Sequence, residues 1–231
     1  PGAPLAPLLQ QHASAITALK TAAPGTTADD AYLLRFVLSH DSHEEQLEAL
    51  QRVKRWREGE GKTICDAAAQ AIAAATADGG WDNGKVVDAA PHSEKIKPFI
   101  GAAQIQTIPG SGYLAYVIRA SAIDEGKLMA SVSKEELADF FVYAKEVNAQ
   151  VALARSVATG KLVLCVTAND LSGINLLGGA DFRSALSLAS KQTASLYPGI
   201  AGPTLLLNLP RLLGALVKLF TPLFPQAVLD K

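Results

Sequence analysis

This sequence has few cysteines, almost no net charge and no long apolar run. Each of these absences excludes a class of protein. The 231 residues contain two cysteines, Cys65 and Cys165, which lie too far apart in sequence for metal-ligand spacing. We interpret them as two reduced, buried thiols of an intracellular protein. The formal net charge of −1 argues against a general nucleic-acid binder. No apolar run reaches the roughly 18–20 residues that a bilayer-spanning helix needs.

Targeting and modification signals are equally scarce. The sequence has no Asn-x-Ser/Thr sequon and no recognisable signal peptide. It begins at Pro1 rather than at a methionine, so a targeting peptide removed before this point stays open. We expect a soluble protein of the cytoplasm or of an organelle.

The motifs of common enzymes are missing as well. There is no Gly-x-Ser-x-Gly nucleophile elbow, and Gly160-Lys161 lacks the flanking residues of a phosphate-binding loop. His40 and His43 have a spacing that can ligate a metal, but a solvated loop at a helix start is the better interpretation. Asp170 follows a predicted strand, where we expect it to cap a turn. We therefore predict no catalytic residue, no cofactor and no metal site, with an enzyme of apolar substrates as one remaining alternative.

Apolar residues, by contrast, are plentiful. They make up 49% of the chain against 19% for charged residues, which is enough for a sizeable core with a cavity. In the first third, apolar residues at helical spacing predict two helices, one capped by Thr27 and one opened by a capping box of Ser42 and Glu45. An alanine-rich helix is predicted over 64–77, followed by a linker that carries one short helix.

The second half of the sequence alternates strands and helices. Residues 114–119, 162–167 and 204–207 are predicted strands. Ser133 and Glu136 form a capping box that opens a helix to about Ser156, and a further helix is predicted over 181–196. This alternation predicts an α/β fold with a mainly parallel sheet and helices on its faces.

The end of the chain holds its most apolar helical stretch, residues 209–224. Its only charges, Arg211 and Lys218, are seven positions apart and fall on roughly one face of a helix. A helix that is apolar nearly all round is buried or meets hydrocarbon, and about sixteen residues are too few to span a bilayer. We therefore predict a lid helix that covers a cavity and moves onto the membrane surface, with hinges at Gly214 and Pro222. The predicted membrane-contacting residues are Leu209, Leu212, Leu213, Leu216, Leu219, Phe220 and Phe224.

Five motifs in this order resemble the CRAL-TRIO lipid-binding family. They are Asp29-Asp30-Ala31-Tyr32-Leu33-Leu34-Arg35-Phe36, the helix end Trp56-Arg57, a first strand at 112–118, the strand at 161–167 with Asn169-Asp170-Leu171-Ser172-Gly173, and Tyr197-Pro198 ahead of Asn208-Leu209-Pro210 and the apolar helix. The resemblance covers most of residues 28–231. It implies a small N-terminal helical domain at 1–61, an alanine-rich helix and linker at 62–104, and a CRAL-TRIO lipid-binding domain with an apolar lid helix at 105–231.

The resemblance also implies residues for a polar head group. In the family's phospholipid carriers one strand supplies two hydroxyls, two residues apart, that bind phosphocholine; Cys165 and Thr167 match them here. Tyr116 matches an aromatic residue of the first strand. Because side chains alternate along a strand, Cys165 and Thr167 share one face, which meets either helices or ligand. Plain core packing is the competing interpretation for all three.

The family's inositol-phosphate site is mostly lost. Its basic pair falls on His40 and Asp41, its glutamate on Gly199 and its threonine on Val228, and only its lysine is kept, as Lys231. A phosphate placed against Asp41, without an arginine or lysine to neutralise it, would be held poorly. The sequence therefore predicts weak phosphatidylinositol binding and a pocket suited to a phosphocholine-type lipid or a more apolar molecule. In the family the chain usually continues past this lysine into another strand.

The resemblance implies a monomeric carrier that is peripheral at membranes. It would bind a single hydrophobic ligand or phospholipid in an internal cavity and transfer or present it at a membrane. Its partners would be that ligand and, transiently, a membrane surface, without nucleic acid. The alternative is a lipid sensor or adaptor that retains its ligand and recruits a partner protein.

Overall fold

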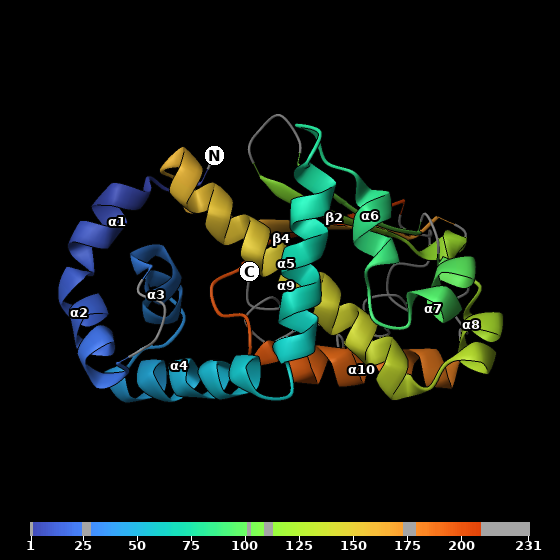
Figure 1. Ribbon diagram of the computed structural model, residues 1–231, viewed down its shortest axis with the longest axis horizontal. Coiled ribbons are helices and arrows are strands. Elements are labelled where there is room, and N and C mark those ends of the chain that lie inside the picture. Colours follow the sequence, from blue (N-terminus) through green and yellow to red (C-terminus); the bar gives the residue numbers. More distant parts are fainter. Residues whose placement is uncertain (1, 25–28, 101–102, 109–112, 173–178, 209–231) are drawn as a thin grey trace.

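The computed structural model describes residues 2–24, 29–100, 103–108, 113–172 and 179–208. Within these ranges the chain has an α/β fold, in which N-terminal helices precede a four-stranded sheet that further helices pack against (Figure 1). The helices are α1 (Leu5–Gln11), α2 (Ala13–Ala22), α3 (Asp30–Val37), α4 (His43–Glu58), α5 (Lys62–Thr76), α6 (Asn83–Asp88), α7 (Ser93–Ile100), α8 (Glu125–Ser131), α9 (Lys134–Thr159) and α10 (Ala180–Ala194). The strands are β1 (Gln104–Thr107), β2 (Leu114–Arg119), β3 (Cys165–Asp170) and β4 (Ala201–Leu207).

The first four helices pack around a core of their own. Its fully buried members include Leu19 of α2, Leu34 and Phe36 of α3, and Leu50 of α4. The helices α1, α2 and α3 are too short to be stable alone, so their order depends on this shared apolar contact. In Figure 1 α1, α2 and α4 surround α3 at the left of the molecule.

Side-chain caps define where two of these helices begin. The Asp29 carboxylate accepts a hydrogen bond from the Ala31 amide at 2.8 Å, so α3 begins after Asp29, and the predicted cap Thr27 lies outside the described residues. The predicted capping box of α4 is confirmed, with Ser42 and Glu45 exchanging hydrogen bonds of 3.2 Å in both directions. These caps satisfy backbone amides that the first helical turn leaves free.

The alanine-rich helix α5 belongs to the second core. Its Ala68, Ala71 and Ala75 are buried in the same cluster as Val147 and Val151 of α9, and small side chains let the two helices approach closely. Where the sequence predicted a linker with one short helix, the structure has two short helices, α6 and α7. Val86 of α6 and Ile96 of α7 are buried in the second core, so this segment is part of the packed domain.

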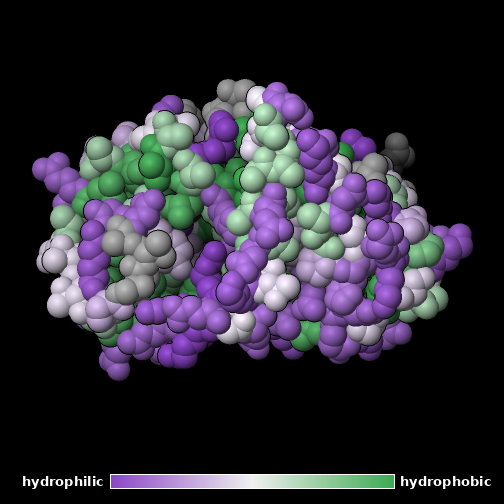
Figure 2. All heavy atoms as spheres, viewed as in Figure 1, coloured by the Kyte–Doolittle hydropathy of each residue, from purple (hydrophilic) through white to green (hydrophobic). Residues whose placement is uncertain are grey.

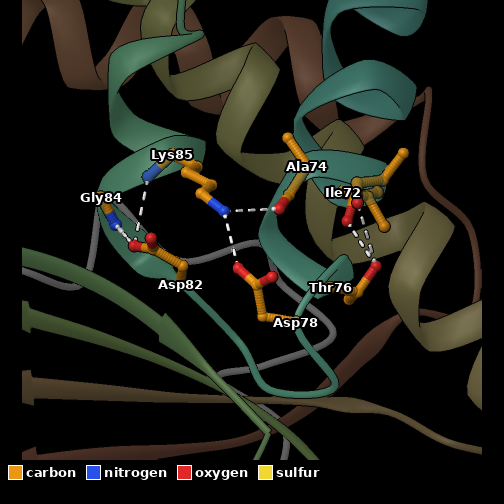
Figure 3. A network of polar contacts seen from close by, with 8 residues as sticks. Ile72, Ala74, Thr76, Asp78, Asp82, Gly84 and Lys85 are labelled. Carbon is orange, nitrogen blue, oxygen red and sulfur yellow. Dashed lines mark hydrogen bonds and ion pairs between the residues drawn. The ribbon is translucent and has the colours of Figure 1, made fainter.

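The turn between α5 and α6 is held by polar contacts (Figure 3). Asp82 caps α6 by accepting hydrogen bonds from the Gly84 and Lys85 amides at 2.9 and 3.4 Å. The Lys85 ammonium donates to Ala74 O at 3.2 Å and lies 3.3 Å from the Asp78 carboxylate. The turn thus places residues 81–83 at a fixed position beside the sheet.

Residues 81–83 cover the outer edge of β1. The Trp81 indole donates a hydrogen bond to Gln106 O at 2.6 Å. The Asn83 side chain donates to Gln104 O at 3.1 Å and accepts from the Gln106 amide at 2.7 Å. Unpaired backbone groups on an edge strand invite pairing with other chains, so these contacts close this edge.

The sheet has the order β1-β2-β3-β4. Strands β2, β3 and β4 run parallel and β1 runs antiparallel to β2, which confirms the predicted mainly parallel sheet. Strand β2 has its predicted bounds, whereas β1 was not predicted. Strand β3 begins three residues later than predicted, because the preceding residues approach the N-terminal arm and Leu162 N donates to Ala3 O at 2.8 Å.

The long helix α9 crosses the molecule diagonally and packs on the sheet (Figure 1). It begins with the predicted capping box of Ser133 and Glu136, which is confirmed, and it ends at Gly160, whose φ of 64° is left-handed. Glycine adopts this conformation without the steric cost that other residues carry. Leu137, Phe140 and other apolar residues of α9 form the centre of the second core.

The predicted lid residues 209–224, with hinges Gly214 and Pro222, lie outside the described residues. Within the described ranges, no helix is both long and apolar enough to cross a bilayer. On the face shown in Figure 2, hydrophilic atoms line the lower edge along α4 and α10, and apolar atoms gather near α1 and the end of α9.

Candidate functional site

The three described head-group candidates lie together on the face of the sheet that packs against α9. In the parallel register Tyr116 lies opposite Thr167, and Leu114 lies opposite Cys165, so their side chains point to one side. Tyr116 and Cys165 are buried in the main core, while Thr167 is half-buried. The fourth candidate, Lys231, lies outside the described residues. Tyr116 and Cys165 thus take part in core packing, and Thr167 is the member of this set nearest to solvent.

Burial keeps this group of side chains neutral. It raises the pKa of the Tyr116 phenol well above its ordinary value, and it raises the pKa of the Cys165 thiol to about 11. The charge of Lys145 and a hydrogen bond from Thr167 oppose the rise at Cys165. At neutral pH the group therefore offers uncharged donors and acceptors.

A buried set of side-chain amides, not predicted from the sequence, lies beside Tyr116. The Gln104 amide donates to the Tyr116 hydroxyl, and the Gln106 amide donates to Asn148 Oδ1 at 2.6 Å and to Ala144 O at 3.0 Å. Asn148 Nδ2 is buried and has no hydrogen-bond partner within the described part of the chain. Asn148 occupies a helical position between the core residues Val147 and Val151, and a polar residue at such a position is a signal that sequence reasoning could have used.

The opposite edge of the sheet exposes apolar side chains. Leu205, Leu206 and Leu207 of β4 are exposed by 46, 37 and 42%. Their register opposite Ala168, Asn169 and Asp170 places Leu206 on the face of Thr167, and the other two on the reverse face. A parallel sheet is ordinarily covered on both faces. The exposed leucines of β4 are not covered within the described residues, so a further apolar partner could pack against them.

Asp170 and Asn208 join the ends of β3 and β4 beside these leucines. Asp170 Oδ1 accepts hydrogen bonds from the Ser172 amide at 3.0 Å and from Asn208 Nδ2 at 2.8 Å. These bonds lower the pKa of the Asp170 carboxyl below its ordinary value, with the Asn208 contact contributing most. The predicted turn-capping role of Asp170 is confirmed, and Asn208 has a left-handed φ of 53°.

A small hollow of about 50 Å³ lies between α3, α9 and the residues before β4. A more open hollow of about 490 Å³ lies between α4, α5 and α9. Tyr116, Cys165 and Thr167 line neither of them. Pockets for drug-sized ligands measure roughly 300–1,000 Å³, so the smaller hollow is too small for a phospholipid.

Arg35 forms one wall of the smaller hollow and fastens α3 to the sheet. Its guanidinium is only 5% exposed and donates to Gly199 O at 2.5 Å, Val163 O at 2.9 Å and Ser156 Oγ at 3.0 Å. Burial lowers the Arg35 pKa to about 10, which a nearby Asp29 opposes, so the group stays charged at neutral pH. Val163 O and Gly199 O stand just before β3 and β4, and Ser156 belongs to α9, so Arg35 ties α3 to the beginning of both strands and to α9.

The position that matches the family's inositol-phosphate glutamate is packed against Arg35. Gly199 has a left-handed φ of 61°, and a Cβ there would lie 3.0 Å from Arg35 O and 3.1 Å from Arg35 Cβ. An acidic side chain at residue 199 would therefore be strained and crowded. Asp41 is exposed, His40 Nδ1 lies 3.1 Å from Phe36 O, and Val228 lies outside the described residues.

A buried ion pair joins α4 to α9 between the two hollows. Arg57 contacts both oxygens of the Glu146 carboxylate, at 2.6 and 2.9 Å, and Gln150 Nε2 donates to the same carboxylate at 2.7 Å. Glu146 is fully buried, so removal of Arg57 would leave an uncompensated charge. The Tyr197 hydroxyl donates to Val142 O at 3.4 Å, and burial together with the nearby Glu146 charge raises its pKa, so the loop before β4 lies beside this network.

The chain matches no known protein-family model and no protein with a curated description. In the ranges that the structure describes, no three His, Cys, Asp or Glu side chains come together as a metal site. The sheet, its exposed leucines and the polar set around Thr167 are therefore the features from which a function is inferred.

Proposed function

We propose that this protein is a CRAL-TRIO-like carrier that binds one hydrophobic molecule or phospholipid and transfers it at membrane surfaces. The observation that carries the proposal is the exposure of three consecutive leucines on β4, immediately before the apolar residues 209–224. Neighbouring exposed apolar side chains on the two faces of an edge strand suit the binding of another apolar body. The mixed sheet with its preceding helices agrees with the fold that the sequence resemblance implies.

The energetics favour a ligand or lid at this position. Burying one leucine or phenylalanine side chain is worth about 1.5–3 kcal/mol. Three leucines of β4 and the apolar side chains of 209–224 can thus gain several kcal/mol from a shared apolar environment. A membrane supplies the same gain to residues 209–224, so transfer of the proposed lid onto a membrane surface costs little free energy.

The contacts of Arg35 and Gly199 bear on the choice of ligand. They fill the position where the resembled family places its inositol-phosphate glutamate. The proposed ligand is therefore a lipid other than phosphatidylinositol, or a more apolar molecule. Lipid extracted from the purified protein and identified by native mass spectrometry tests this choice, and phosphatidylinositol as the main ligand would contradict it.

The lid is tested by lipid transfer between vesicles. Leu213→Glu combined with Phe220→Asp should abolish transfer while the protein keeps its thermal unfolding temperature, because charged side chains cannot enter hydrocarbon cheaply. The matched control is Leu38→Glu combined with Val157→Asp, which charges two exposed apolar residues away from β4 and should leave transfer unchanged. Equal transfer by both double variants contradicts the lid, and slow exchange with a tightly held ligand favours the adaptor alternative.

A further inference from the structure

A second hydroxyl lies beside Thr167, on the neighbouring strand. Thr204 of β4 is the register partner of Thr167, which in turn is the register partner of Tyr116 on β2. Register partners in a parallel sheet point to the same face, so Thr167 and Thr204 present adjacent hydroxyls toward the α9 side. Both residues are half-buried, whereas Tyr116 is buried. The two hydroxyls therefore lie at the boundary between the buried part of the α9-facing side of the sheet and the exposed β4 edge.

A buried donor without a partner lies on α9, above the same face of the sheet. Asn148 is 1% exposed, and its Oδ1 is occupied by Gln106, but its Nδ2 has no partner among the described residues. Buried amide groups almost always have a hydrogen-bond partner, because leaving one unpaired is unfavourable. We therefore expect Asn148 Nδ2 to donate a hydrogen bond to an acceptor outside the described residues.

A half-buried cation lies one helical turn before Asn148. Lys145 precedes Asn148 by three residues, so both lie on neighbouring positions of one α9 face. The Lys145 charge reaches the Cys165 thiol, two residues before Thr167 on the same face of β3. Lys145 forms no ion pair within the described ranges, and the adjacent Glu146 carboxylate is held by Arg57.

We propose that Lys145, Thr167 and Thr204, with the free amide of Asn148, form a site for one singly charged oxygen anion at the polar end of the ligand. This inference rests on the carrier function proposed above. One lysine neutralises one charge, so a phosphodiester or a carboxylate fits the site. A phosphomonoester, which carries about 1.5–2 charges at neutral pH, leaves part of its charge unbalanced in a half-buried place.

Two matched pairs of probes test the site and separate its two ligand sources. The first pair is a fluorescent long-chain fatty acid and its methyl ester, which differ only in the carboxylate. The second is phosphatidylglycerol and diacylglycerol, taken up from vesicles of an uncharged galactolipid, because phosphatidylcholine carries a phosphodiester of its own and would compete for the site. Loss of a hydrogen bond to a charged group weakens binding roughly ten- to hundredfold. We expect the wild-type protein to prefer the charged member of at least one pair by this factor.

The variants isolate the lysine and the new hydroxyl. Lys145→Met should remove the preference and leave the affinity for the neutral member unchanged, and Lys145→Arg should restore most of it. Thr204→Val should reduce the preference to a smaller extent. Lys191→Met, at an exposed lysine of α10, is the control and should keep the full preference. Thermal unfolding of each variant verifies that it folds.

The outcomes distinguish this site from the function on which it rests. Binding of no probe by the folded wild-type protein overturns the carrier function and the site together. Equal binding of charged and neutral members, or a preference that survives in folded Lys145→Met, overturns the site alone. A preference confined to the fatty-acid pair identifies a carboxylate ligand, and one confined to the lipid pair identifies a phosphodiester.

Discussion

The two edges of the sheet differ in what occupies them. At β1 the Trp81 and Asn83 side chains pair with the outward backbone groups of the strand, so the edge is closed by the chain itself. At β4 three consecutive leucines are exposed, and only β3 pairs with the strand within the described ranges. The β1 edge is therefore closed by contacts within the chain, and under the proposed function the β4 edge binds an apolar partner reversibly.

The largest effect is expected where the beginning of β4 is fastened. Arg35→Ala removes a buried guanidinium and leaves Gly199 O and Val163 O without the Arg35 donor, while Ser156 Oγ keeps its hydrogen bonds with Val163 N and Ala152 O. Unsatisfied buried groups of this kind cost about 1–3 kcal/mol each, so we expect the free energy of unfolding to fall by about 3 kcal/mol or more.

The control for this change is Arg52→Ala. Arg52 forms an ion pair with Glu48 at 3.3 Å on the surface of α4, and such pairs contribute about 0.2–1 kcal/mol. Urea denaturation of both variants gives the comparison. Equal losses at residues 35 and 52 would show that Arg35 does not hold the start of β4.

A smaller effect should separate the two edges directly. Asn83→Ala removes both side-chain hydrogen bonds to β1 and should lower the free energy of unfolding by about 1–3 kcal/mol, with lipid transfer unchanged. Leu206→Asn, at an exposed leucine of β4, should leave stability within about 0.5 kcal/mol and slow transfer. The opposite pattern, with stability lost at residue 206 and transfer lost at residue 83, would reverse the roles assigned to the edges.

The smallest effect is expected where Asp170, at the end of β3, binds Asn208 after β4, and it depends on pH. The folded protein lowers the Asp170 pKa through Asn208 and Ser172, so this carboxylate stabilises the fold above the ordinary aspartate pKa of about 3.9. That contribution is lost as the pH falls through the lower pKa of the folded state. Asp170→Asn should therefore be slightly less stable than the wild type at neutral pH, and the difference should vanish in acid. A difference that is constant with pH would mean that the charge of Asp170 is not involved.

Local sequence patterns predicted the features that depend on neighbouring residues. The capping boxes at Ser42 and Ser133 follow from four consecutive residues each, and both are present. The alternation of strands and helices was enough for the mainly parallel sheet. Strand β1 was missed because Gln104 and Gln106, which are polar, occupy its buried positions. Their burial depends on Tyr116 and Asn148, which are distant in sequence.

The candidate site was predictable only within a single strand. Alternation along β3 placed Cys165 and Thr167 on one face, as the structure does. The neighbour Thr204 depends on how β3 and β4 align, and Asn148 depends on how α9 packs on the sheet. Strand 162–167 was predicted too early because Val163 and its neighbours are apolar, whereas their backbone groups bind Arg35 and the N-terminal arm.

The span of the Arg35 contacts has a consequence for the order in which the chain folds during synthesis. Its partner Gly199 lies 164 residues later in the sequence, and Val163 lies 128 residues later. Among the described residues, Leu153 of α9 is the one member of the α1–α4 core that comes from later in the sequence, so this core can form as soon as its own residues leave the ribosome. Until Val163 and Gly199 have been synthesised, the Arg35 guanidinium remains solvated by water. Contacts between residues so distant in sequence form slowly. We therefore expect the N-terminal helices to fold first, and their hydrogen bonds to the rest of the protein through Arg35 to form among the last.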